Sequence, residues 1–97
     1  MLHIVNKSPT QTTALASCLR LAQPGAALLL TEDAVYAATA AGAHALGDAL
    51  TTLKVYALRP DLEARGMADR MAEGVTPVDY AGFVDLVVEH SSNQSWL

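Results

Sequence analysis

Short apolar runs alternate with longer helix-like segments, and this alternation constrains the fold more than any other feature of the sequence. The runs of strand length are residues 2–5, 26–30, 55–58 and 75–78. Residues 26–30 are apolar without interruption, which is typical of a strand covered on both faces. Pro77 removes a backbone donor and places the last run at a sheet edge. Because alternating strands and helices imply right-handed crossovers, we predict an α/β fold with a mostly parallel sheet and helices on both faces.

The segments between these runs carry helix signals. Helices are expected over residues 10–23, 34–41, 43–52, 61–65 and 80–89. Asp33, Asp61 and Asp79 stand where each could cap a helix N-terminus. Gly42 is expected to interrupt the middle helical stretch, and Gly66 to end the short helix before it.

The last expected helix carries one apolar stripe, and a polar tail follows it. The stripe consists of Tyr80, Phe83, Val84, Val87 and Val88, opposite Asp85 and Glu89. Residues 91–97 look disordered, yet they hold the only tryptophan, Trp96. A large aromatic side chain is costly to expose, so Trp96 is expected to dock either on its own domain or on a neighbouring subunit.

Length and composition favour one small domain with a partner. Residues 1–97 suffice for a single domain near the lower size limit for independent folding. Apolar residues make up 52% of the chain and charged residues only 16%, although 18 alanines account for part of the apolar share. The remaining excess suggests that apolar surface is covered by another chain, so we expect an oligomer.

Charge and hydropathy exclude several classes of partner. The net charge is −4, and Lys and Arg form no cluster, so direct binding to nucleic acid is not expected. The N-terminal residues lack the pattern of a secretory signal, and residues 26–30 are far too short to span a bilayer. With a single cysteine, these features predict a cytoplasmic protein that does not bind membranes.

Cys18 is the only residue on which thiol chemistry could rest. It lies near the middle of the apolar face of the expected helix over residues 10–23, within roughly 20° of its centre. A cysteine in such a position is usually a small buried hydrophobe, and mid-helix it gains little from the helix dipole. Geometry therefore favours an unreactive thiol over a reactive one.

Two polar segments follow strand ends and could bind ligands. Residues 6–13 offer hydroxyls at a helix N-terminus, where Ser8 or Thr10 could serve as the cap. A flavodoxin-like binder of flavin or a small anion is therefore an alternative, although the loop lacks the glycines of phosphate-binding motifs. Glu32 and Asp33 could bind a metal or act as a phosphoacceptor pair, but helix capping and solvation explain them more simply.

No other metal or catalytic motif stands out. His3, His44 and His90 lack the spacing of metal ligands. No Gly-x-Ser-x-Gly motif supports a serine triad. We expect neither a metal site nor a cofactor.

Several strings, in order and at the right spacing, resemble one family. They cover residues 2–9, 28–38, 55–66, 78–87 and 94–96, and only the alanine-rich residues 40–50 match poorly. Together they resemble the TusB/DsrH family of sulfur-relay subunits. The resemblance implies a three-layer α/β/α sandwich of four to five strands like that of the DsrE, DsrF and DsrH proteins.

The resemblance also implies partners and a pathway. Such subunits assemble with TusC/DsrF-like and TusD/DsrE-like paralogues into a dimer of heterotrimers. The persulfide cysteine belongs to the TusD/DsrE-type subunit, and sulfur passes to a TusE/DsrC-type acceptor. The end use is 2-thiouridine at the tRNA wobble position or dissimilatory sulfur oxidation. This chain would be mainly an architectural subunit.

The same resemblance raises a second possibility for Cys18. DsrH-type members carry a cysteine in Ser-Cys-Leu, here residues 17–19, whereas many TusB-type members lack it. This tilts the interpretation toward the Dsr branch and makes Cys18 a candidate sulfur carrier. That role requires solvent access and a nearby cation such as Arg20.

Overall fold

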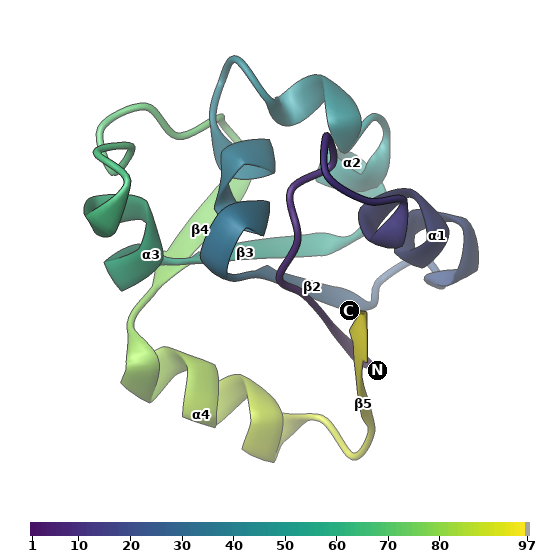
Figure 1. Cartoon of the computed structure of the whole chain (residues 1–97). Coiled ribbons are helices and arrows are strands. Elements are labelled where there is room, and N and C mark those ends of the chain that lie inside the picture. The colour runs from purple at the N-terminus through teal and green to yellow at the C-terminus, as the bar shows by residue number, and fades with distance from the viewer. Residues whose placement is uncertain (97) are drawn as a thin grey trace.

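The computed structural model describes residues 1–96, which contain one sheet of five parallel strands (Figure 1). The strands are β1 (Leu2–Val5), β2 (Ala27–Leu30), β3 (Lys54–Leu58), β4 (Val75–Val78) and β5 (Asn93–Trp96). Their order across the sheet is β4-β3-β2-β1-β5. Leu2 pairs with Ala27 of β2 on one side and with Asn93 of β5 on the other. The predicted α/β class is confirmed, and β4, which contains Pro77, lies at an edge as expected.

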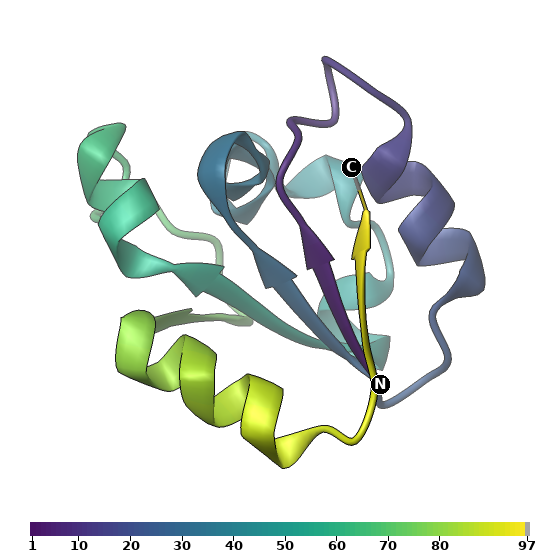
Figure 2. The same cartoon turned by 60° about the horizontal axis from the view of Figure 1, so that its bottom comes forward.

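Crossover handedness decides which helices cover which face of the sheet. The steps from β1 to β2, β3 and β4 all move in the same direction across the sheet, so right-handed crossovers place their helices on one face. The connection from β4 to β5 runs back across the sheet and places α4 (Tyr80–Glu89) on the opposite face. Figure 2 shows α4 on one side of the sheet and α1 (Ala14–Leu21) and α3 (Arg59–Ala64) on the other.

The two faces differ in how well they are buried. The larger core lies under α1 and α3, where Leu15 and Leu62 pack with Leu28 and Leu30 of β2. The smaller core, on the α4 face, consists of Leu2, Ala27, Leu29 and Leu86. All four residues of β2 are buried, which confirms the prediction of a strand covered on both faces.

Helix α4 covers only part of its face. Five strands about 4.8 Å apart span roughly 19 Å, whereas one helix is about 10 Å wide. Leu86 is the buried residue of α4, while Tyr80, Val84 and Val88 of the predicted stripe are exposed. Of the predicted stripe, Phe83 packs against the smaller core, whereas the other members face outward. No helix in residues 1–96 is long and apolar enough to cross a membrane.

The first helix is shorter than predicted. It begins at Ala14 rather than Thr10, because the residues before it bond among themselves. The carbonyl oxygen of Ser8 accepts from the amides of Gln11 and Thr12, and Thr12 Oγ1 accepts from the amide of Ala14. Neither Ser8 nor Thr10 caps α1, so both cap predictions are wrong.

The middle stretch is also more broken than predicted. It consists of two 3₁₀ helices, η1 (Glu32–Ala38) and η2 (Ala43–Ala45), and one α-helical turn, α2 (Ala49–Thr52). Thr39 ends η1, since its hydroxyl donates to the carbonyl oxygen of Tyr36 and accepts from the amide of Gly42. Gly42 interrupts the helices as predicted, and a Cβ there would collide with the carbonyl oxygen of Tyr36.

Of the three predicted aspartate caps, one is confirmed. Asp79 Oδ1 accepts from the amide of Gly82 at 2.8 Å and caps α4. The other two predictions are wrong, because both side chains bind partners in other parts of the fold. Asp33 lies inside η1 and pairs with Arg65, whereas Asp61 lies inside α3 and accepts from the backbone of Glu32.

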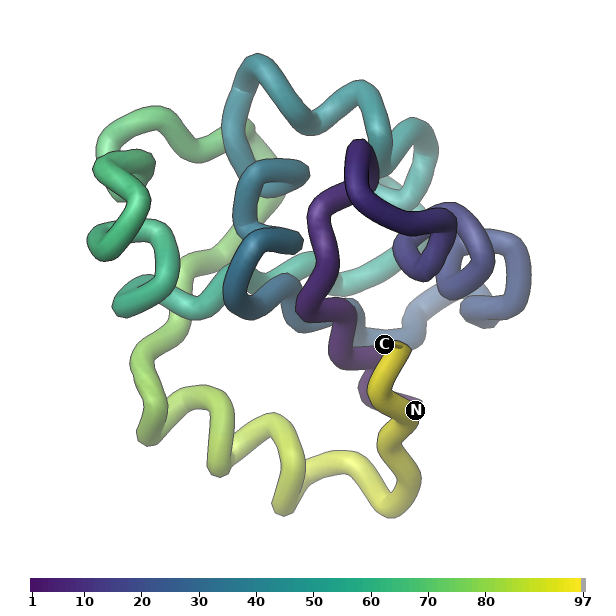
Figure 3. Tube along the Cα trace, viewed as in Figure 1, coloured from purple at the N-terminus to yellow at the C-terminus, as the bar shows by residue number. Residues whose placement is uncertain are grey.

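The predicted disordered tail is wrong for residues 93–96, which form β5 beside β1. The strands that carry the two chain ends therefore lie side by side (Figure 3). Trp96 Nε1 donates to Nδ1 of the buried His3 at 3.1 Å, and Trp96 packs against the larger core. Of the two options for Trp96, docking on its own domain is the one observed, and it anchors β5 to the sheet. Leu97 lies outside the described residues.

The pH dependence of unfolding should show the effect of burying His3. Burial, followed by the positive charge of the Met1 amino group, lowers the pKa of His3 below 6.5. The unfolded chain therefore binds the proton more readily, so stability falls as pH drops below about 6.5. We expect a lower urea midpoint at about pH 5.5 than at about pH 7.5, and His3→Gln should shrink the difference.

His44 provides the matched control, because it is exposed. His44→Gln should keep the full pH dependence of the urea midpoint. An equal dependence in His3→Gln and the wild type would contradict the assignment to His3.

Candidate functional site

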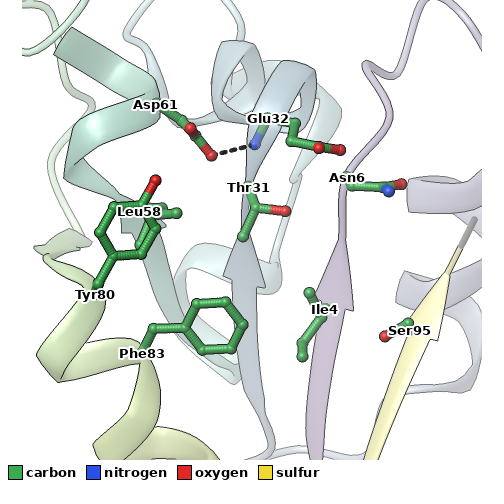
Figure 4. A pocket seen from close by; sticks show the side chains of 9 residues that line it. All are labelled: Ile4, Asn6, Thr31, Glu32, Leu58, Asp61, Tyr80, Phe83 and Ser95. Carbon is green, nitrogen blue, oxygen red and sulfur yellow. Dashed lines mark hydrogen bonds between the residues drawn. The ribbon is translucent and has the colours of Figure 1, made fainter. Parts of the chain in front are cut away.

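A cavity of about 290 Å³ opens at the carboxyl ends of the strands, on the α4 side of the sheet (Figure 4). From β1, the chain continues to β2 on one side and ends in β5 on the other, so strand order reverses here. Open parallel sheets bind ligands in the crevice at such a reversal. The cavity is lined by Ile4, Asn6, Thr31, Glu32, Leu58, Asp61, Tyr80, Phe83 and Ser95.

The cavity has an apolar floor and a polar rim. Figure 4 shows Phe83 reaching from α4 toward the strands, with Ile4 on β1 beyond it. Tyr80 stands at the start of α4 with its hydroxyl toward Asp61. The volume is near the lower end of small-molecule pockets, about 300 Å³. It suits a single long side chain better than a bulky cofactor.

A strained backbone residue shapes the rim. Glu32 has φ of +48°, a left-handed conformation that costs a non-glycine residue about 1–3 kcal/mol. Its amide donates to Asp61 Oδ2 at 2.6 Å. This bond links the end of β2 to α3 and offsets part of the strain.

The predicted acidic pair is divided by the structure. Asp33 accepts from Nη2 of Arg65 at 2.8 Å and from its Nε at 3.1 Å. The carboxylate of Glu32 points instead toward Asn6 (Figure 4). The two acids therefore do not converge on one ligand. In residues 1–96 no group of three or more His, Cys, Asp or Glu side chains could hold a metal ion.

Asn6 contributes an unusual polar atom beside this rim. Its Oδ1 atom is buried and has no hydrogen-bond partner among the described residues. An unpaired buried acceptor costs about 1–3 kcal/mol. This end of β1 therefore has unused capacity to accept a hydrogen bond.

Cys18 lies away from this cavity, in the larger core under α1. Its exposed fraction is 0%, and burial raises the pKa of its thiol to about 11. Roughly one molecule in ten thousand then carries a thiolate at pH 7. Arg20, the expected cation, donates to Ser17 Oγ at 3.2 Å. The geometry supports the unreactive alternative.

The loop over residues 6–13 uses its polar groups internally. Ser8 Oγ lies 2.9 Å from Thr10 Oγ1, and the amide of Ser8 donates to Gln11 Oε1. The loop borders a second cavity of about 450 Å³ together with Tyr36 and His44. The amides of Ser8, Thr10, Gln11 and Thr12 all donate within the loop, so they are not available to an anion.

Sequence reasoning missed Asn6, Asp61, Tyr80 and Phe83 as neighbours in one cavity. Asn6 and Asp61 both closely follow strands, and that position was the available signal. The two aromatic residues come from α4, whose placement depends on the return crossover.

The five-stranded parallel sheet, the cavity at its carboxyl edge and the buried Cys18 define a small parallel α/β protein with a buried thiol. The family model described as "DsrH like protein" matches residues 7–93, so the chain belongs to the DsrH-like family. It is 42% identical over 96 residues to Protein TusB of Escherichia coli O1:K1 / APEC, covering 99% of this chain and 100% of that protein. Protein TusB of Shigella boydii serotype 18 is 41% identical with the same coverage.

A solved structure also shares the fold. It is that of MTH1491, a protein of unknown function from Methanobacterium thermoautotrophicum. The TM-score is 0.73 at 18% identity, and the match covers 97% of this chain and 95% of that chain.

Exchanging Glu32 for glycine should test the strained rim. Glu32→Gly removes the steric cost of the left-handed conformation, so we expect the free energy of unfolding to rise by about 1 kcal/mol. Asp61→Ala removes the acceptor of the Glu32 amide and should lower it by about 1 kcal/mol. Urea unfolding measures both changes.

Glu63 is the control, since it is an exposed acid on the same helix as Asp61. Glu63→Ala should leave the free energy of unfolding within about 0.5 kcal/mol of the wild type. Destabilisation by Glu32→Gly would show that the Glu32 side chain, rather than its backbone, matters for stability.

Proposed function

We propose that this chain is a non-catalytic subunit of a cytoplasmic, heterohexameric sulfur-relay complex. Its partners are TusC/DsrF-like and TusD/DsrE-like paralogues, and the complex passes persulfide sulfur to a TusE/DsrC-type acceptor. Membership of the DsrH-like family and full-length identity to proteins named TusB support the relay.

The observation that carries the non-catalytic role is the burial of Cys18. A persulfide carrier must meet a donor and an acceptor protein in turn, so its sulfur needs access to solvent. Cys18 has none, and its raised pKa keeps the thiol protonated. The carrier role therefore falls to a cysteine of the TusD/DsrE-like subunit.

The relatives also bear on the end use of the sulfur. Identities of 41–42% over nearly the whole chain are to proteins named TusB. This favours 2-thiouridine synthesis at the tRNA wobble position over sulfur oxidation. The presence of Cys18 in the sequence had favoured the Dsr branch instead. Deleting the gene should then lower wobble 2-thiouridine in bulk tRNA, measured by mass spectrometry of nucleosides. Unchanged 2-thiouridine would move the protein to the other branch.

Coexpression tests the assembly. The tagged chain should copurify with both paralogous subunits from the same organism in equimolar amounts, and light scattering should give the mass of two heterotrimers. A monomer that leaves both paralogues in the flow-through would contradict the proposal.

Replacing the thiol separates structure from chemistry. In the assembled complex with a cysteine desulfurase, Cys18→Ala should deliver as much sulfur to the acceptor as the wild type. Intact-mass measurement should find the sulfur adduct on the TusD/DsrE-like subunit. An adduct on this chain that Cys18→Ala removes would make Cys18 a carrier.

The folded thiol should also react slowly with Ellman's reagent. The same thiol in urea should react at least about 100-fold faster, because burial and the raised pKa are both lost. The unfolded chain thus serves as its own control. Equal rates would contradict the burial of Cys18.

A further inference from the structure

The outer side of α4 carries a continuous apolar ridge. Tyr80, Val84 and Val88 stand four residues apart, so they follow one another along the helix. They are 60%, 60% and 79% exposed. Rows of this spacing are the ridges that pack into grooves between helices. On the α4 side, nothing in residues 1–96 covers this ridge.

The ridge continues into the cavity at the carboxyl ends of the strands. Tyr80 belongs to both, and Phe83 lines the cavity with Ile4 while packing against the smaller core. The ridge and the cavity together form one surface, which we call the α4 surface. Aromatic anchors beside a pocket are the typical centre of protein interfaces.

The charge around the α4 surface is almost entirely negative. Its acidic residues lie on the cavity rim and along the helix: Glu32, Asp61, Asp79, Asp85 and Glu89. None of them forms a salt bridge in residues 1–96, where the recorded ion pair is Asp33 with Arg65. Two basic residues lie nearby: Arg59 lines a pocket with Asp79 and Gly82, and Arg65, already paired with Asp33, donates to the backbone carbonyl of Asp61. The surface therefore complements a partner with basic residues.

A second copy of this chain fits the α4 surface poorly. Residues 79–89 contain three acidic residues and no Lys or Arg. Packing two such helices together would bring like charges into a low-dielectric contact, which costs several kcal/mol. A different chain with cations beside apolar side chains avoids that repulsion.

We propose that the α4 surface docks a different polypeptide chain, which packs apolar side chains against Val84 and Val88 and inserts a lysine or arginine into the cavity beside Tyr80. The inserted cation lies between Glu32 and Asp61, and its aliphatic part contacts Phe83. This inference rests on the proposed function, because it places one of the paralogous subunits on α4.

Exchanging Val84 for aspartate tests the ridge. Val84→Asp adds a charge to an exposed position, so the free chain should fold normally, as checked by circular dichroism and the urea midpoint. The two paralogues are coexpressed with each other and purified without this chain. The dissociation constant for their complex with Val84→Asp should be at least about tenfold higher than with the wild type. Val88→Asp should weaken binding as well. It serves as a second variant in case Val84→Asp fails to fold.

Leu21 offers the matched control, because it is 64% exposed at the end of α1, on the other side of the sheet. Leu21→Asp should leave the dissociation constant within about threefold of the wild type. Equal weakening by Leu21→Asp and Val84→Asp would overturn the assignment to the α4 surface.

Charge reversal tests the chemistry of the partner. Binding of the wild type should weaken as salt rises, because the partner is basic. Asp85→Lys with Glu89→Lys should weaken binding at low salt and flatten the salt dependence. Asp69→Lys, at an exposed acid remote from α4, should do neither. Salt-independent binding, or no effect of the double reversal, would overturn the basic partner.

The outcomes separate this inference from the proposed function. If the wild type binds neither paralogue, the proposed function fails. If the wild type binds and Val84→Asp and Val88→Asp bind equally well, the relay assignment stands and the α4 inference is overturned. Self-association that Val84→Asp abolishes, without paralogue binding, would assign the α4 surface to a second copy.

Discussion

The return crossover from β4 to β5 is the constraint on which the rest of the structure depends. Three steps in one direction place several helical segments on one face of the sheet, and the single step back places α4 alone on the other. One helix cannot cover five strands, so an apolar ridge on α4 and most of β5 remain exposed. Four of the exposed large apolar side chains, Tyr80, Val84, Val87 and Val88, therefore lie together on α4.

The same asymmetry separates the thiol from the cavity. Cys18 lies in the well-covered core under α1, where burial removes access and raises its pKa to about 11. The cavity lies on the sparsely covered face, where acidic residues and an unpaired Asn6 oxygen surround an apolar floor. One face therefore holds most of the core, and the other leaves apolar and acidic side chains exposed. This division is consistent with the proposed role of an architectural subunit.

Polar contacts between residues distant in sequence shape the carboxyl edge of the sheet. Asp61 holds the strained backbone of Glu32, and Arg65 holds Asp33, so two adjacent acids are drawn to different sides of η1. A third long-range hydrogen bond, from Trp96 to His3, connects the two ends of the sequence and fixes β5 beside β1. All three contacts join residues far apart in the chain: the first two position the segment that follows β2, and the third holds the two terminal strands together.

The sequence by itself determined the first four strands, their parallel class, the cap at Asp79, the edge position of Pro77 and the apolar face that buries Cys18. These features follow from local periodicity and backbone chemistry, which neighbours along the chain decide. The tertiary structure alone decided that residues 93–96 pair with β1, that Asp33 and Asp61 bind other elements, and that most of the stripe on α4 faces outward. Apolar spacing marks a helix face but not what lies opposite it, and only the direction of the crossovers determines which face receives a second layer.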